Sequence, residues 1–128
     1  MDKNVYEEGT LKYYSFFKDS KEMEEEQYGL LPCDVAVSLQ IFGTKIKILV
    51  VKELLKGTKR FSELNRAIPC TQKVLTSNLR ELEKDKIISR KVYAVVPPKV
   101  EYSLTEIGKT IEPIINLMNK WGAYYRNL

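Results

Sequence analysis

Residues from Asp34 to Gly57 show the hydrophobic periodicity of two successive α-helices. The first is predicted to begin at Asp34 and to end before Gly43, with its apolar positions at Val35, Leu39 and Phe42. Thr44 is predicted to cap the second, which spans about 44–56 and which Gly57 ends. Its buried stripe is predicted to be Ile46, Leu49, Val50 and Leu54, with Lys45, Lys47, Lys52 and Lys56 facing water.

Two further helices follow, separated by a short turn. Ser62 is predicted to cap a two-turn helix that Pro69 halts, and Thr71 to cap a longer helix over about 72–85. In this longer helix Leu75, Leu79 and Leu82 recur at i, i+4 and i+7 and share one face. Two helices joined by a three-residue turn are typical of a helix-turn-helix.

After Lys86 the period of apolar residues changes to two, which predicts a β-hairpin. Pro97 and Pro98 cannot donate to a strand ladder, so we place them in its turn, between strands that carry Arg90, Lys91 and Lys99.

A final helix is predicted after Thr105, with a break near residue 112 caused by Pro113. Its apolar positions are Ile107, Ile111, Ile114, Ile115, Met118, Trp121 and Tyr125. This belt is wider than a domain of this size needs to cover, so we expect part of it to meet a second subunit in a homodimer.

The chain has 128 residues, the length of one domain, and its charge is unevenly spread. Residues 1–30 carry four lysines and eight acidic residues, whereas residues 31–128 carry 17 basic and nine acidic residues. We therefore divide it into an acidic, aromatic arm over 1–30 and a basic domain over 31–128. Such a basic domain would attract a phosphate backbone, and the alternative interpretation is an ordinary solvated lysine surface.

Composition excludes several classes of function. The chain has no histidine and two cysteines, too few ligands for a structural zinc site, and no paired carboxylates stand apart from ordinary surface charge. We expect no enzyme activity, no metal and no cofactor. The start at Met1 lacks a secretion signal and no apolar run is long enough to span a membrane, so we expect a cytoplasmic protein without membrane association.

The far side of the 72–85 helix indicates how such a domain would read DNA. Gln72, Lys73, Thr76, Ser77 and Arg80 occupy its first half, where a recognition helix presents donors and acceptors to base edges in the major groove. An ordinary exposed face would more often mix glutamate among the lysines, and residues 72–80 contain none. The basic hairpin after it would be a wing that touches backbone phosphate or the adjacent minor groove.

Over about 31–125 the residues resemble the HxlR family of winged-helix transcriptional regulators. The resemblance lies in the Arg-Phe-Ser-Glu-Leu motif at 60–64, in the pattern from Gln72 to Thr76, and in the run from Val96 to Thr105 followed by Gly108. The chain departs from the family at Thr44 and Ile46, where glycine and tryptophan are usual.

The resemblance implies a mainly α fold with a small β-hairpin (α+β), a winged helix-turn-helix with additional N- and C-terminal dimerisation helices. The candidate DNA-binding residues are Gln72, Lys73, Thr76, Ser77, Arg80, Arg60, Arg90, Lys91 and Lys99. Cys33 stands where some relatives carry a cysteine that senses oxidants or electrophiles, whereas Cys70 occupies a position that is ordinarily apolar core.

We therefore expect a homodimeric, sequence-specific regulator that binds double-stranded DNA. Its recognition helix, about 72–85, would enter the major groove and its wing, about 88–104, would contact the backbone or minor groove. A small-molecule or electrophile effector would fit this function. The alternative is a winged-helix module that binds protein without reading DNA sequence.

Overall fold

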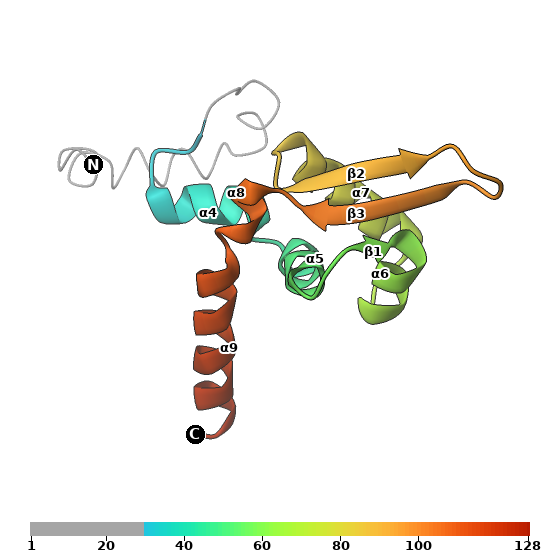
Figure 1. Ribbon diagram of the computed structural model, residues 1–128. Helices are drawn as coiled ribbons and strands as arrows, with labels where there is room; N and C mark the ends of the chain where they lie inside the picture. Colours follow the sequence, from blue (N-terminus) through green and yellow to red (C-terminus); the bar gives the residue numbers. More distant parts are fainter. Residues whose placement is uncertain (1–29) are drawn as a thin grey trace. The chain divides into compact units, whose positions relative to one another are not determined.

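The structure, a computed structural model, describes residues 30–128, so the arm predicted over 1–30 lies outside the described residues except for Leu30. The chain divides into two compact units, one ending at Ile41 and one spanning Phe42–Leu128. In chain order the described elements are α4 (Asp34–Phe42), α5 (Lys45–Leu55), β1 (Lys59–Arg60), α6 (Phe61–Ala67), α7 (Gln72–Lys84), β2 (Ile88–Tyr93), β3 (Lys99–Leu104), α8 (Glu106–Lys109) and α9 (Glu112–Arg126) (Figure 1). The predicted class, mainly helical with a small sheet, is confirmed. No helix in this part of the chain is both long and apolar enough to cross a membrane.

Helix α4 is the described element of the first unit. The Val37 amide donates to the Cys33 carbonyl oxygen at 2.8 Å, and the Leu31 amide donates to Oε1 of Gln40 at 3.1 Å. Cys33 and Ala36 are buried, whereas two of the predicted apolar positions, Val35 and Leu39, are 68% and 60% exposed. The predicted helix is therefore confirmed, but of its three predicted apolar positions only Phe42 is buried.

Threonine caps begin α5 and α7, as the sequence predicted. The Thr44 hydroxyl oxygen accepts from the Lys47 amide at 3.1 Å, and that of Thr71 accepts from the Val74 amide at 3.2 Å. Each cap satisfies an amide that has no partner inside the first turn of its helix.

The predicted Ser62 cap of α6 is wrong. The helix begins earlier, at Phe61, with Arg60 as its N-cap. The Arg60 amide donates to the Glu63 carboxylate at 3.1 Å, so the acidic residue three positions after the cap stabilises this earlier start.

Helices α5, α6 and α7 share the core of the second unit. Leu75, Leu79 and Leu82, predicted to share the buried face of α7, are at most 2% exposed. The other fully buried side chains of this unit are Val50 and Val51 in α5, Leu64 in α6, Ile68 directly after α6, and Ile88 in β2. The helix-turn-helix is thus held together by one continuous apolar contact.

Lys47 was predicted to face water and is instead 5% exposed. Its ammonium nitrogen lies 2.7 Å from Oε2 of Glu81 in α7, and this carboxylate compensates the buried charge. Periodicity along α5 carries no information about an acidic partner on another helix, so the burial of Lys47 could not be predicted from it.

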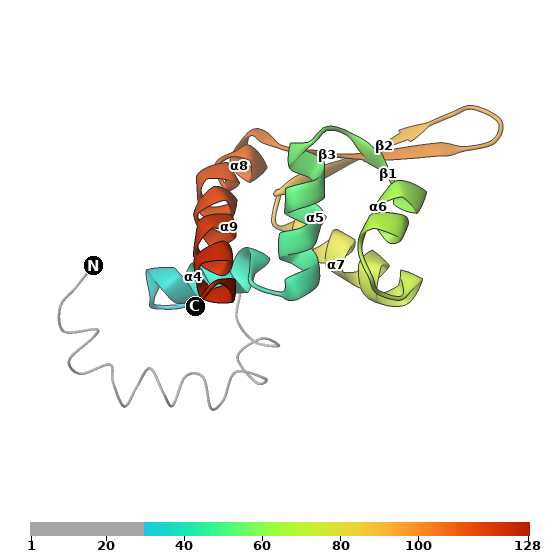
Figure 2. The same cartoon turned by 90° about the horizontal axis from the view of Figure 1, so that it is seen from below.

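The three strands form an antiparallel sheet in the order β1-β3-β2. Ile88 pairs with Leu104 and Tyr93 with Lys99, so β2 and β3 form the predicted hairpin, with both prolines in the turn. This wing extends past α6 and α7 in both views (Figures 1 and 2). Strand β1 was not predicted, because two residues carry no periodicity and Lys59 pairs with a residue far along the chain, Tyr102.

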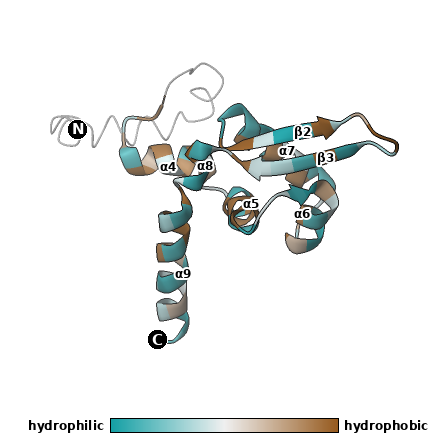
Figure 3. Cartoon of the chain, viewed as in Figure 1, coloured by the Kyte–Doolittle hydropathy of each residue, from teal (hydrophilic) through white to brown (hydrophobic). Residues whose placement is uncertain are grey.

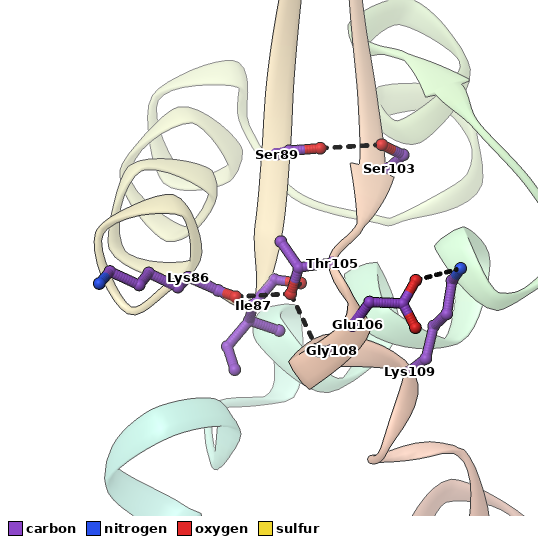
Figure 4. A network of polar contacts seen from close by, with 8 residues as sticks. All are labelled: Lys86, Ile87, Ser89, Ser103, Thr105, Glu106, Gly108 and Lys109. Carbon is purple, nitrogen blue, oxygen red and sulfur yellow. Dashed lines mark hydrogen bonds and ion pairs between the residues drawn. The ribbon is translucent and has the colours of Figure 1, made fainter.

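A polar network ties the base of the wing to the end of α7 and the start of α8 (Figure 4). The Thr105 hydroxyl lies 2.6 Å from the carbonyl oxygen of Lys86 and accepts from the Gly108 amide at 3.0 Å. A Cβ placed on Gly108 would lie 2.2 Å from the Ile87 carbonyl oxygen. Glycine is thus required where α8 approaches the backbone that leads into β2.

The predicted break in the last helix is confirmed. Helix α8 ends at Lys109, and Pro113 lies in the first turn of α9, where its missing amide costs no helical hydrogen bond. Ile111 and Ile115 are buried, but the rest of α9 leaves its apolar residues exposed. Figure 1 shows this helix running away from the sheet.

Replacing Gly108 with alanine is expected to lower the free energy of unfolding by about 1–3 kcal/mol, the usual cost of overpacking, because the new methyl group collides with backbone that cannot rotate away. Urea unfolding followed by circular dichroism measures this change. The control Glu106→Ala removes only an exposed i,i+3 ion pair on the same short helix and should cost less than about 1 kcal/mol. Equal stability of Gly108→Ala and the wild type would contradict the close approach.

Candidate nucleic-acid interface

Helix α7 has four distinct sides, set by its rotation of about 100° per residue. The leucine stripe faces the core, and Asn78 and Glu81 lie together on one flank. Thr76, Arg80 and Glu83 lie on the opposite flank, and the side farthest from the leucines is exposed. Each flank contacts a different part of the fold.

The first flank is attached to α5. The Thr44 hydroxyl donates to Oδ1 of Asn78 at 2.9 Å, and Nδ2 of Asn78 donates back to the Val74 carbonyl oxygen of its own helix at 2.8 Å. One turn further along, Lys47 pairs with Glu81. These two contacts from the first turn of α5 fix the rotation of α7 about its axis.

The exposed side of α7 is polar and carries positive charge. Lys73, Ser77 and Lys84 lie at its centre, with Gln72 and Arg80 nearer the second flank, and all five are exposed. Thr76 is half-buried at the edge. The structure therefore presents the five predicted α7 residues on one continuous surface, at an angle that the α5 contacts determine.

The basic residues of the wing are divided between its two faces, because successive side chains of a strand point to opposite sides. Arg90 pairs with Tyr102, which is buried, so Arg90 lies on the face of the sheet that meets the helices. Lys91 pairs with Glu101 and Lys99 with Tyr93, and these four residues lie on the opposite face.

Arg60 belongs with this second group. It pairs with Glu101 in the β1-β3 ladder, and directly opposed side chains of an antiparallel pair lie on the same face. The structure thus brings Arg90 toward α7 and places Arg60, Lys91 and Lys99 on the outer face of the sheet.

The outer end of the wing combines charge with apolar surface. The ammonium nitrogens of Lys91 and Lys99 each lie 4.9 Å from the centroid of the Tyr93 ring, within the range of a cation–π contact. Beyond them Val95 and Val96 are exposed in the turn, Val96 completely, and Figure 3 shows this end of the hairpin as hydrophobic. Tyr93 was not among the predicted site residues, since an isolated tyrosine in a strand gives no signal of the two lysines beside it.

A hollow of about 270 Å³ separates α7 from the wing. It is lined by Thr76, Leu79, Arg80, Glu83, Arg90 and Tyr102. Two predicted DNA-binding arginines, one from α7 and one from β2, therefore border the same space. Among residues 30–128, no group of three or more cysteine or acidic side chains is arranged to hold a metal ion.

Comparison with known proteins assigns this arrangement to a family. The model of the HxlR-like helix-turn-helix family matches residues 41–128. Among the curated relatives, the HTH-type transcriptional regulator YdeP of Bacillus subtilis is 50% identical over 96 residues, which cover 74% of this chain and 75% of YdeP. YtcD of the same organism is 45% identical over 106 residues, 82% of each chain.

Solved structures of transcriptional regulators share the fold of this chain. The chain is similar to the redox regulator HypR in its reduced form, with a TM-score of 0.70 and 48% identity over 73% of this chain and 94% of the other. The reduced form of the transcriptional regulator YodB from B. subtilis has a TM-score of 0.61 and 34% identity over 71% of this chain and 91% of the other. These proteins are transcriptional regulators and not enzymes.

Proposed function

The chain belongs to the HxlR-like family of helix-turn-helix transcriptional regulators, and from this premise we propose that it binds double-stranded DNA as a homodimer. In this proposal α7 enters the major groove and the β2–β3 wing contacts the backbone or the adjacent minor groove. The protein would act in the cytoplasm, where its DNA lies. The observation that carries the proposal is the exposed polar side of α7, free of glutamate from Gln72 to Arg80 and fixed in rotation by α5.

The division of charge in the wing supports a role for each of its faces. Arg90 lies beside α7 and would contact the strand of backbone nearest to that helix. Lys91 and Lys99 lie on the outer face beside Tyr93, and Arg60 follows at the base of the same face. These three cations would contact phosphates farther from the major groove, to either side of the minor groove that the wing approaches.

The exposed side of α9 supports homodimerisation. Its apolar residues recur at helical spacing on one side and are at least 41% exposed; they are Ile114, Leu117, Met118, Trp121, Tyr124 and Tyr125, and Leu128 follows just after the helix. Trp121 and Tyr125 stack with ring centroids 5.4 Å apart, which gives the centre of this stripe a flat aromatic surface. Aromatic side chains of this kind dominate the energy of protein interfaces, and a second copy of α9 would cover them in a symmetric, self-complementary contact.

Cys33 is proposed as the residue that couples this regulator to oxidants or electrophiles. The solved relatives include the redox regulator HypR, in its oxidised and reduced forms, and YodB after treatment with diamide. Cys33 is buried directly before α4, and its carbonyl accepts the first helical hydrogen bond. Oxidation would enlarge and polarise a buried side chain, so it would force the start of α4 to repack.

Lys73→Ala and Arg80→Ala are each expected to weaken binding to a duplex selected from a random DNA pool by about 1–3 kcal/mol, because each removes a cation from the proposed groove surface. Fluorescence anisotropy at several salt concentrations measures the change. The wild-type affinity should fall steeply with salt, by about 0.9 log units per phosphate contact per log unit of salt. The control Lys109→Ala removes an exposed cation that pairs with Glu106 on α8 and should bind as the wild type does. Salt-independent binding would favour the protein-interaction module instead.

Trp121→Glu is expected to raise the dissociation constant of the dimer by about 30-fold or more, because a carboxylate at the centre of the apolar stripe would be buried without a partner. Analytical ultracentrifugation measures this. Trp121 is the one tryptophan of the sequence, so its emission should also shift to the red when the wild type is diluted. The control Asn119→Glu places the same charge on the far side of α9 and should leave a dimer. A monomeric wild type, or a dimeric Trp121→Glu variant, would contradict the proposal.

Diamide is expected to change the DNA affinity of the wild type and of Cys70→Ser, but not of Cys33→Ser. Cys70 is the matched control because it is the second cysteine of the chain and is half-buried. The measurement is an anisotropy titration before and after treatment, with reversal by dithiothreitol. A full response in Cys33→Ser would exclude this residue as the sensor.

A further inference from the structure

The hollow between α7 and the wing is lined by two arginines that come from different elements. Arg80 projects from the second flank of α7, and Arg90 projects from the inner face of β2. Both are exposed, and within residues 30–128 neither takes part in any hydrogen bond or ion pair with another side chain. Glu83 borders the same hollow and is likewise unpaired in this part of the chain.

We propose that this hollow binds one backbone phosphate of the DNA. The guanidinium groups of Arg80 and Arg90 would donate hydrogen bonds to it from opposite sides. The inference rests on the proposed function and adds a ligand and a position to it. A guanidinium group offers parallel N–H donors that match two phosphate oxygens, so two arginines can satisfy one phosphodiester. The half-buried hydroxyl of Thr76 supplies a further donor at the same edge of α7.

The path of the DNA backbone explains why the phosphate would lie here. A major groove and the adjacent minor groove are separated by a single sugar-phosphate strand. If α7 occupies the first and the wing approaches the second, that strand must pass over the space between them. The hollow lies between α7 and the wing, so the sugar-phosphate strand would pass directly over it.

The floor of the hollow strengthens such a contact. Leu79 and Tyr102 are 2% and 8% exposed, so an anion held above them has apolar atoms below it and less water around it than at an open surface. A charge-assisted hydrogen bond is stronger in surroundings of low polarity. Arg80, which the sequence suggested as a reader of base edges, becomes instead the residue that sets the register of α7 along the strand.

A phosphate in the hollow would also be affected by the charge of Glu83. Its carboxylate borders the hollow and repels an anion bound there, whereas it would be indifferent to a contact made elsewhere on the wing. Glu83→Gln should therefore tighten DNA binding by about threefold, with a gain that becomes smaller when Arg90 is also replaced, because Arg80 alone then holds the phosphate. A merely structural role for Glu83 predicts no such gain.

The decisive experiment replaces single phosphates of the selected duplex by neutral methylphosphonates, one position at a time, and compares the wild type, Arg90→Gln and Lys109→Gln. One phosphate in each half-site should weaken wild-type binding by about tenfold when neutralised, the effect of a charge-assisted contact. At that position Arg90→Gln should lose only about threefold, because the contact of Arg80 alone remains to be lost, while Lys109→Gln should lose as much as the wild type.

Losses that are the same for Arg90→Gln and the wild type at every position would overturn the phosphate site and leave the regulator function intact. Failure of the wild type to select any duplex would contradict both the phosphate site and the proposed DNA-binding function.

Discussion

The burial of three leucines of α7 is the constraint on which the rest of this structure depends. Leu75, Leu79 and Leu82 are at most 2% exposed, and their removal from water keeps one side of α7 against α5 and α6. Because a helix has only one opposite side, the same burial turns Lys73 and Ser77 outward. The contacts of Asn78 and Glu81 with the first turn of α5 then remove the remaining freedom of rotation about the axis.

In the wing, the alternation of side chains along a strand determines which basic residues face α7. Alternation along β2 sends Arg90 toward α7 and Lys91 away from it, so two adjacent basic residues serve different surfaces. Pairing with β3 makes these assignments rigid, and the Thr105 network fixes the base of the hairpin to the end of α7 (Figure 4). The helix and the wing therefore form one surface in which the spacing between Arg80 and Arg90 is built in.

Local signals were sufficient to predict most of the elements. The threonines that cap α5, α7 and α8, the leucine repeat and the paired prolines all act within a few residues of the structure that they specify. The wrong Ser62 cap involved a local bond, between the Arg60 amide and Glu63, but two other failures depended on contacts distant in the sequence. Strand β1 exists only through β3, and Lys47 is buried only because Glu81, 34 positions later, compensates it. The candidate base-reading residues could be predicted by periodicity, whereas the hollow that joins Arg80 to Arg90 required the fold.

Methylation of the selected duplex by dimethyl sulfate tests the central claim most directly, because the reagent attacks guanine N7 in the major groove and adenine N3 in the minor groove. The account predicts that the bound protein protects guanine N7 in two segments about one helical turn apart. It also predicts protected adenine N3 in the minor groove next to each segment, where the wing lies. Binding that leaves every guanine N7 as reactive as in free DNA would contradict the placement of α7.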